Sequence, residues 1–239
     1  MTGNREAWES EAQNWLRWAR TPGHDAYWYY RTSFFDSIVP PPRGVTLEVG
    51  CGEGRVVRDL VARGHQVIAI DGSPTLLRHA AEADLVGRYA LADALALPIG
   101  DSRVDLAVAY NSLMDFDDLP AAVQQVSRVL KPGSDFCVCV VHPLFDAGGF
   151  ADDSEDSPYV LRGCYFSTQQ FDETFEEEGT TMRFRGWSHS LEEYFGALSG
   201  AGFAVESLRE PLPEEGEAGY SRRRRYPMFL HLRAVKTRR

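Results

Sequence analysis

One segment constrains the fold more than any other, because an apolar run passes directly into alternating glycines and then into an amphipathic stretch. It reads Val45-Thr46-Leu47-Glu48-Val49-Gly50-Cys51-Gly52-Glu53-Gly54-Arg55. A short apolar run that ends at glycine is typical of a buried strand. Glycine also lets the backbone approach a ligand with no side chain in between. The segment therefore predicts a strand, a binding loop and the start of a helix.

Short apolar runs then alternate with amphipathic stretches as far as residue 141. This alternation indicates βαβ units and a parallel sheet. We expect strands at 45–49, 66–70, 88–91, 104–109 and 136–141, with helices at 55–63, 74–83 and 120–130. Farther on, the pattern predicts a helix at 191–199 and strands at 203–208 and 228–235.

Residues 1–42 are predicted to form a helical extension that precedes the main domain, 43–239. Trp8, Ala12, Trp15 and Ala19 fall on one helical stripe, which we expect to pack against the main body. Four aromatic residues follow in a row at 27–30, and neighbouring helical residues point about 100° apart. These aromatics therefore cannot all face one core. They either pack between helices or form a lid that faces a ligand.

Residues 144–186 interrupt the alternating pattern and are predicted to be an insert on the substrate side. The stretch 146–178 holds ten acidic residues and one arginine, which amounts to nine of the ten net negative charges. Within it, 169–176 and 180–185 predict a hairpin. The acidic residues are either a solvated loop or a feature that favours a cationic amine as substrate. The basic run Arg222 to Arg225 is either a solvated loop or an anion site.

The overall charge and composition exclude several classes of protein. A net charge of -10 repels phosphate backbones, so nucleic acid is not expected as a partner. The N-terminus is acidic where a signal peptide is basic, and no 18 apolar residues occur in succession, so we expect a soluble cytoplasmic protein with no membrane partner. The four cysteines lack the spacing of a metal site, and no metal is predicted. The oligomeric state stays open.

The spacing of the glycines argues against two common nucleotide sites. The dinucleotide fingerprint places glycines at relative positions one, three and six, whereas here they stand at one, three and five, with Arg55 in the sixth place. A nicotinamide oxidoreductase is therefore a weaker hypothesis. No Gly-Lys-Ser/Thr ending of a phosphate loop follows either.

Acidic residues end the next two predicted strands. Asp71 stands 21 residues beyond Gly50, where an acid can bind both hydroxyls of a ribose. Asp93 ends the third strand, in a place to accept a hydrogen bond from the amine of a base. Three consecutive strand ends thus converge on one nucleoside-shaped ligand at the switch point of the sheet.

These motifs resemble the class I S-adenosylmethionine-dependent methyltransferases, in particular the group called type 11 domains. The resemblance covers residues 45–141, with specific motifs at 47–54 and in Val129-Leu130-Lys131-Pro132-Gly133, and it resumes at 190–203. It implies an α/β fold with a Rossmann-like, doubly wound, seven-stranded sheet. The implied sheet has five parallel strands and an antiparallel pair, with helices on both faces. The implied cofactor is S-adenosylmethionine.

The resemblance also implies roles for individual residues. The backbones of residues 50–52 would pass the methionine part of the cofactor, with Glu48 supporting that loop. Asp71 would hold the ribose, Asp93 the adenine amine, and the end of the fourth strand would lie beside the sulfonium. The implied cofactor-binding residues are Glu48, Gly50, Cys51, Gly52, Asp71, Gly72, Asp93, Ala94, Asn111 and Ser112.

The acceptor of the methyl group is expected to be a small molecule, because the Asn-Pro-Pro-Tyr type of motif is absent and the surface is acidic. The predicted substrate pocket contains Tyr27, Trp28, Tyr30 and Asp115. His142 follows the fifth strand, where it is either a general base or a structural cap of the strand end. An alternative function is a protein of the same fold that binds S-adenosylmethionine without transferring its methyl group, as a cyclase or a regulator.

Overall fold

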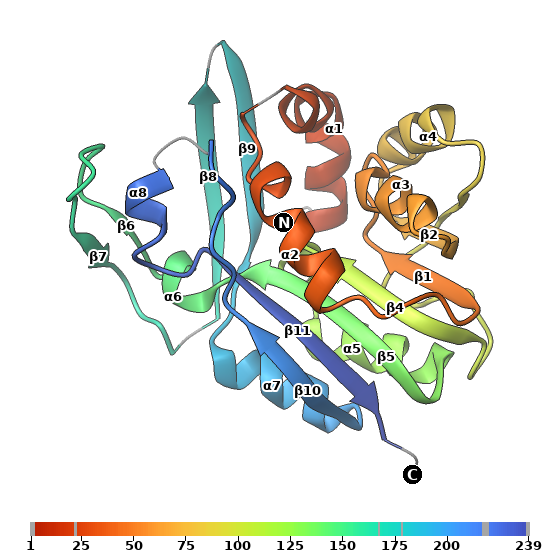
Figure 1. The fold of residues 1–239 in the computed structure, drawn as a ribbon. Helices are drawn as coiled ribbons and strands as arrows, with labels where there is room; N and C mark the ends of the chain where they lie inside the picture. The colour runs from red at the N-terminus through yellow and green to blue at the C-terminus, as the bar shows by residue number, and fades with distance from the viewer. Residues whose placement is uncertain (1–2, 22, 167, 178, 217–219, 238–239) are drawn as a thin grey trace.

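A seven-stranded sheet forms the centre of the molecule (Figure 1). The computed structural model describes residues 3–237 except 22, 167, 178 and 217–219. The strand order is β10-β11-β5-β4-β1-β2-β3. Strands β1 to β5 are mutually parallel, and β11 runs antiparallel to both β5 and β10. The strands are β1 (Val45–Val49), β2 (Gln66–Asp71), β3 (Arg88–Leu91), β4 (Val104–Tyr110), β5 (Leu130–Val141), β10 (Phe203–Arg209) and β11 (Phe229–Lys236).

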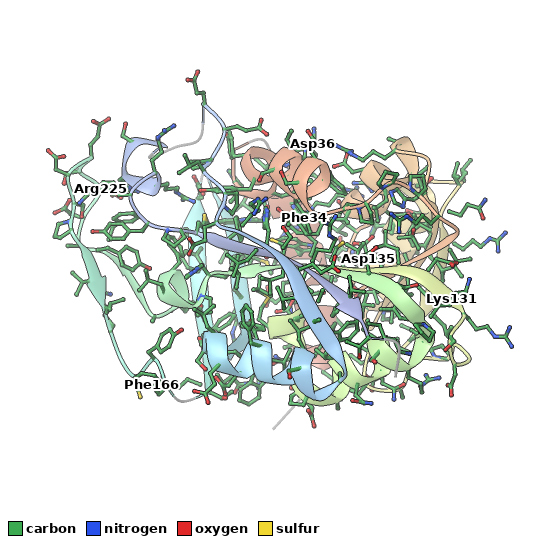
Figure 2. All side chains as sticks on the ribbon, turned by 60° about the horizontal axis from the view of Figure 1, so that its bottom comes forward. Phe34, Asp36, Lys131, Asp135, Phe166 and Arg225 are labelled. Carbon is green, nitrogen blue, oxygen red and sulfur yellow. The ribbon has the colours of Figure 1, made fainter. Side chains whose placement is uncertain are left out.

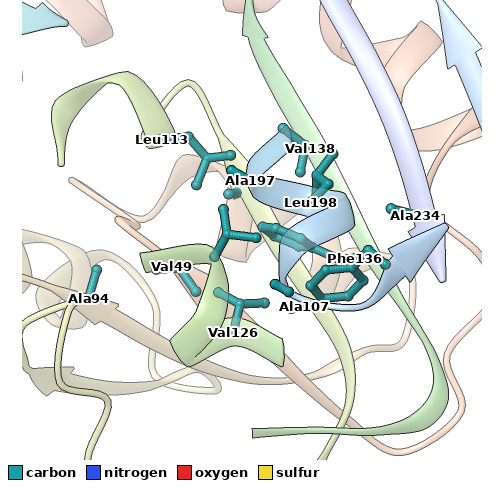
Figure 3. Close-up of a cluster of buried hydrophobic side chains, with 14 of the residues drawn as sticks. Val49, Ala94, Ala107, Leu113, Val126, Phe136, Val138, Ala197, Leu198 and Ala234 are labelled. Atoms are coloured by element: carbon teal, nitrogen blue, oxygen red, sulfur yellow. The ribbon is translucent and has the colours of Figure 1, made fainter. Parts of the chain in front are cut away.

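Helices cover both faces of this sheet (Figure 1). On one side, β5 side chains such as Phe136 and Val138 pack against Val126 of α5 and Leu198 of α7 (Figure 3). On the other side, Phe34 of α2 and Leu60 of α3 are fully buried against the sheet. The helices of the domain are α1 (Asn4–Arg20), α2 (Tyr27–Ser37), α3 (Arg55–Ala62), α4 (Pro74–Ala83), α5 (Leu119–Val129) and α7 (Leu191–Gly200). The predicted doubly wound α/β fold with an N-terminal helical extension is confirmed.

The segment after β5 leaves the sheet before the chain returns to it. The hairpin of β8 and β9 stands beside α1 (Figure 1). Its two predicted strands are confirmed, and they extend one residue farther in β8 and three residues farther in β9. The outer part of the segment carries Phe166, whose side chain is 83% exposed and projects from the edge of the molecule (Figure 2). The elements of this segment are α6 (Pro143–Asp146), β6 (Gly148–Phe150), β7 (Tyr159–Leu161), β8 (Gln169–Glu177) and β9 (Thr180–Ser188), and the short α8 (Tyr220–Arg223) follows β10.

The strand and helix ends agree with the sequence prediction within one residue, with two exceptions: β9 ends three residues later than predicted, and β5 begins six residues earlier. β5 was expected from residue 136 but begins at Leu130, so the Lys131-Pro132-Gly133 turn lies within its paired length. Its pairing with β4 shifts register between Val104 and Leu106, which accommodates the turn. Within the described residues, no helix is long and apolar enough to span a membrane.

Candidate functional site

A cavity of about 800 Å³ opens at the carboxyl edge of the parallel strands. Its volume lies in the range of small-molecule sites. Its floor is formed by the ends of β1, β2 and β4 and by the loop after β3. All ten residues predicted to bind the cofactor line this one cavity: Glu48, Gly50, Cys51, Gly52, Asp71, Gly72, Asp93, Ala94, Asn111 and Ser112.

The loop after β1 owes its shape to glycine. Gly50, Gly52 and Gly54 have φ values of +77°, +54° and +84°, which residues with a Cβ rarely adopt. A Cβ on Gly50 would lie only 2.5 Å from the Cβ of Ser112. The loop can therefore pass close to the end of β4, and this brings the two strand ends to the same side of the cavity.

Asp71 connects the first two strand ends. One carboxylate oxygen accepts a hydrogen bond from the backbone N–H of Gly52 at 2.7 Å, and the other accepts from the N–H of Ser73 at 2.8 Å. Burial raises the pKa of Asp71, while these hydrogen bonds favour the carboxylate. Each oxygen keeps acceptor capacity that a ribose hydroxyl can use.

The remaining floor residues come from the loop after β3 and from the end of β4. The Asp93 side chain is exposed at the cavity and accepts a hydrogen bond from the N–H of Leu95 at 2.8 Å. Ser112 donates from its hydroxyl to the carbonyl of Val49 at 2.6 Å. Asn111 has a positive φ of 49°, which turns the chain sharply as β4 ends. The ends of β4 and β1 are thus tied to each other directly.

Glu48, which the resemblance implies to support the glycine loop, has an unusual carboxylate. Its Oε2 atom has no hydrogen-bond partner among the described residues. The side chain is almost fully buried at the cavity, and burial raises its pKa well above the usual range. A buried acceptor without a partner is destabilising unless a ligand supplies a donor or a positive charge.

The roof of the cavity is made by α1 and the β8–β9 hairpin. Its aromatic side chains contact one another edge to face, with ring centroids 6.1 Å apart for Trp15 and Phe184 and 5.8 Å apart for Trp18 and Phe184. The aromatic residues of the roof that line the cavity are Trp8, Trp15, Trp18, Phe171, Phe175 and Phe184. The predicted stripe of tryptophans on α1 thus lines the cavity and also packs against β9.

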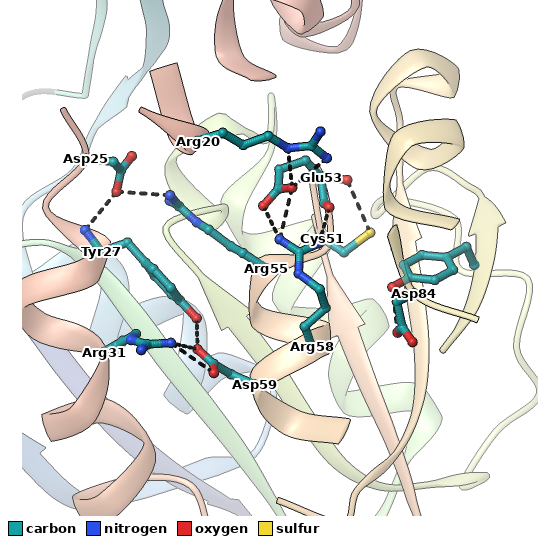
Figure 4. A network of polar contacts seen from close by, with 12 residues as sticks. Arg20, Asp25, Tyr27, Arg31, Cys51, Glu53, Arg55, Arg58, Asp59 and Asp84 are labelled. Carbon is teal, nitrogen blue, oxygen red and sulfur yellow. Dashed lines mark hydrogen bonds and ion pairs between the residues drawn. The ribbon is translucent and has the colours of Figure 1, made fainter. Parts of the chain in front are cut away.

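Ion pairs join the roof to the loop below it (Figure 4). Glu53, in the glycine loop, binds Arg20 at the end of α1 and Arg58 of α3. Arg55 forms an ion pair with Asp25 at 3.1 Å, and both side chains are largely buried. The glycine loop is therefore attached to the N-terminal extension by its side chains while its backbone faces the cavity.

Three aromatic residues predicted for the substrate pocket are not among those that line the cavity, and these predictions are wrong. Tyr27 is buried, and its hydroxyl donates to Asp59 (Figure 4). Tyr30 is fully buried with its ring on Phe229, and Trp28 is 38% exposed outside the cavity. Of the four aromatic residues at 27–30, Tyr27 and Tyr30 pack α2 against the sheet.

His142 also lies elsewhere than its proposed role as a general base requires. Its Nδ1 accepts a hydrogen bond from the N–H of Leu144 at 3.0 Å, and its Nε2 pairs with Glu210 at 3.0 Å. It is not among the residues that line the cavity. The hypothesis of a general base at His142 is not supported, because Nδ1 caps α6, Nε2 pairs with Glu210 and the side chain does not line the cavity. The alternative structural role is the one observed.

Asp115 is where the sequence analysis placed it, at the cavity, on the short turn (Leu113–Asp115) after β4. Burial raises the pKa of its carboxyl well above the usual range, and the nearby Asp71 adds to this effect. The neighbouring Trp8 indole opposes this rise in pKa.

Several lining residues were missed because they meet only in three dimensions. Arg55 was noted only as the residue that breaks the dinucleotide spacing, although its place at the first turn of α3 is a signal that it faces the ligand loop. The contact between Trp15 and Phe184 joins elements about 170 residues apart, and no local pattern predicts it. No cluster of potential metal ligands occurs within the described part of the chain.

Comparison with known proteins identifies the region that builds the floor. Residues 47–138 match the family model described as "Methyltransferase domain". A malonyl-[acyl-carrier protein] O-methyltransferase of Pseudescherichia vulneris is 37% identical over 87 residues, which cover 36% of this chain and 35% of that protein. This chain thus spans about a third of the length of the curated relatives that it matches.

Solved structures share the fold over a larger part of the chain. An S-adenosylmethionine-dependent methyltransferase from Mesorhizobium loti has a TM-score of 0.69 at 22% identity and covers 88% of this chain and 98% of its own. The [4+2]-cyclase SpnF has a TM-score of 0.65 at 17% identity, covering 98% and 96%. At these identities the likeness concerns the fold alone. The predicted resemblance to class I S-adenosylmethionine-dependent methyltransferases is confirmed.

The matched methyltransferase domain model and the similar solved structures point to S-adenosylmethionine as the cofactor, and the residues present fit it. This cofactor carries a ribose with two hydroxyls, an adenine amine, and positive charges at its sulfonium and ammonium groups. Asp71 and Asp93 offer acceptors for the first two, and the unpartnered Oε2 of Glu48 suits a positively charged donor.

Proposed function

We propose that this protein transfers the methyl group of S-adenosylmethionine to a small-molecule acceptor. The observation that carries this proposal is that the ten cofactor-binding residues expected from the motifs line a single cavity. The same cavity continues under the aromatic roof, which leaves room for a second molecule beside the cofactor site.

The bound cofactor would supply a methyl group already activated by a positively charged sulfur. The protein then has to orient the acceptor and keep water away. In the proposed site, Asp71 and the backbone of residues 50–52 hold one partner. The aromatic side chains of α1 and of the hairpin cover the other and exclude solvent. Because His142 caps α6, no histidine base is part of this proposal.

Two measurements test the proposal. Calorimetric titration should show one site for S-adenosylmethionine and for S-adenosylhomocysteine and none for NADH. Incubation with methyl-labelled cofactor and a panel of amine, phenol and carboxylic acid acceptors should release S-adenosylhomocysteine. Binding without any release would favour the alternative of a cyclase or regulator with the same fold. Binding of NADH in place of S-adenosylmethionine would overturn the proposal.

A further inference from the structure

The part of the cavity beyond the strand ends has walls suited to a flat apolar group. Trp8 and Trp15 of α1 have ring centroids 5.7 Å apart, and Trp15 in turn contacts Phe184 of β9. These side chains line the cavity together with Phe171 and Phe175. An aromatic or alkyl body of an acceptor can lie against this wall.

The charged groups at this end of the cavity favour a cation. Three arginines line the cavity against ten acidic residues. Arg55 pairs with Asp25, while Arg5 donates to the neutral carbonyl of Gly72 and Arg223 to the sulfur of Met228. No basic side chain of a described residue forms an ion pair with Asp115. The carboxylates of Glu176 and Glu177 also line the cavity, from the end of β8.

Asp115 differs from the other acidic groups in its surroundings. Asp71 and Asp93 have backbone donors, whereas the carboxyl of Asp115 is half-buried at the cavity, beside the Trp8 indole and near the carboxylate of Asp71. A desolvated carboxylate in a negative environment is stabilised by a positive ligand. The same wall already accepts a cation elsewhere, since the guanidinium of Arg55 lies 5.0 Å from the centre of the Trp15 ring.

We propose that the acceptor is an amine, bound as its ammonium ion with the nitrogen at Asp115 and the apolar body against Trp8, Trp15 and Phe184. This inference rests on the proposed function and specifies its substrate class. An ammonium nitrogen has no lone pair, so it must lose one proton before it can accept a methyl group. The carboxylate of Asp115 is placed to take that proton and become the neutral acid.

Three probes of one shape test the proposal by binding alone. They are 2-phenylethylamine, 2-phenylethanol and 3-phenylpropanoate, each titrated by calorimetry into the protein saturated with S-adenosylhomocysteine. We expect the amine to bind at least about tenfold more tightly than the alcohol, and the carboxylate to bind most weakly. Equal binding of the amine and the alcohol, or no binding of the amine, would overturn the proposal.

Two matched variants localise the charge. Asp115→Asn should weaken the amine about tenfold and leave the alcohol unchanged. Asp153→Asn, which removes a carboxylate from the rim where it pairs with Arg222, should change the amine less than twofold. Equal losses in the two variants would overturn the role of Asp115. If Asp115→Asn fails to fold, the three probes on the unmodified protein still decide.

The same experiments separate this inference from the proposed function. S-adenosylmethionine binding with release of its methyl group to an alcohol or phenol, and no preference for the amine, would refute the inference and keep the function. If S-adenosylmethionine does not bind, the titrations are repeated on the free protein. A preference for the amine there would refute the function and keep the site.

Discussion

The floor and the roof of the cavity are built in different ways. In the floor, hydrogen bonds join the strand ends: the N–H of Gly50 donates to the carbonyl of Ile70, and the N–H of Gly52 donates to the carboxylate of Asp71. Below them, side chains such as that of Leu47 are fully buried. The roof helix α1 is attached by a small apolar cluster and by polar contacts, among them that of Glu9 with Ser73. The difference indicates a rigid cofactor site under a cover that opens at lower free energy.

The first prediction compares two glycines with the same φ of +77°, one in the floor and one in the roof. Gly50→Ala should lower the free energy of unfolding by about 2–4 kcal/mol and abolish cofactor binding, because the new Cβ collides with Ser112. Gly179→Ala, whose Cβ would meet no described atom within 4 Å, should cost about 1 kcal/mol. Urea denaturation measures both, and equal losses would contradict the distinction between floor and roof.

The second prediction concerns the acid of the floor. Asp71→Asn should weaken S-adenosylmethionine binding by about 1–3 kcal/mol, because a charged acceptor is lost beside the ribose. Asp84→Asn is the matched control, since Asp84 also accepts from backbone N–H groups, those of Val86 and Gly87, but does not line the cavity. Calorimetry should show unchanged affinity for the control. Unchanged affinity for Asp71→Asn would remove Asp71 from the site.

The third prediction tests the attachment of the roof. Glu9 accepts hydrogen bonds from the Ser73 hydroxyl and from the backbone and hydroxyl of Thr75. Glu9→Gln should weaken this attachment by about 1 kcal/mol. Hydrogen exchange in α1 should then be faster, with no change in the central strands. Faster exchange in β1 as well would mean that floor and roof unfold as one unit.

The roof should also respond to acid. The hydrogen bonds to Glu9 lower its pKa below the usual 4.5, although burial opposes them. A carboxylate with a lowered pKa stabilises the folded state above its unfolded value, and this contribution is lost as the pH falls below 4.5. The protection of the α1 amides, measured relative to the intrinsic exchange rate at each pH, should therefore fall below this pH in the unmodified protein, and less so in Glu9→Gln.

The smallest effect is expected at His142. His142→Ala should cost about 1 kcal/mol of stability through the lost cap, while His142→Asn keeps an acceptor at the cap and most of the stability. Neither variant should change turnover. Burial lowers the pKa of His142, so its contribution to stability is present above the usual 6.5 and is lost as the pH falls below that value. A large drop in turnover with His142→Asn would restore the hypothesis of a general base.

The same contrast explains how much the sequence could predict. Strand ends and glycines at positive φ follow from short-range rules, so the sequence predicts Gly50, Asp71 and Asp93 as neighbours. The roof depends on which distant elements meet. Tyr27 and Tyr30 looked like ligand-facing residues, but α2 buries them on the sheet, and Trp15 reaches the cavity only because α1 packs on β9.

The unpartnered Glu48 lay beyond prediction for another reason. The sequence shows an acid one residue before the last position of β1, but not that its Oε2 lacks a hydrogen bond there. Such an atom is found only when every neighbour is in place. The ion pair of His142 could not be predicted for the same reason, because its partner Glu210 follows β10, about 70 residues farther along the chain.

The most direct measurement is a crystal structure of the protein grown with S-adenosylhomocysteine. The account predicts the adenosyl group on the floor of the cavity, with both ribose hydroxyls on the carboxylate of Asp71 and the amino acid end beside Glu48. A ligand bound elsewhere on the molecule, or one in the cavity with its ribose away from Asp71, would contradict it.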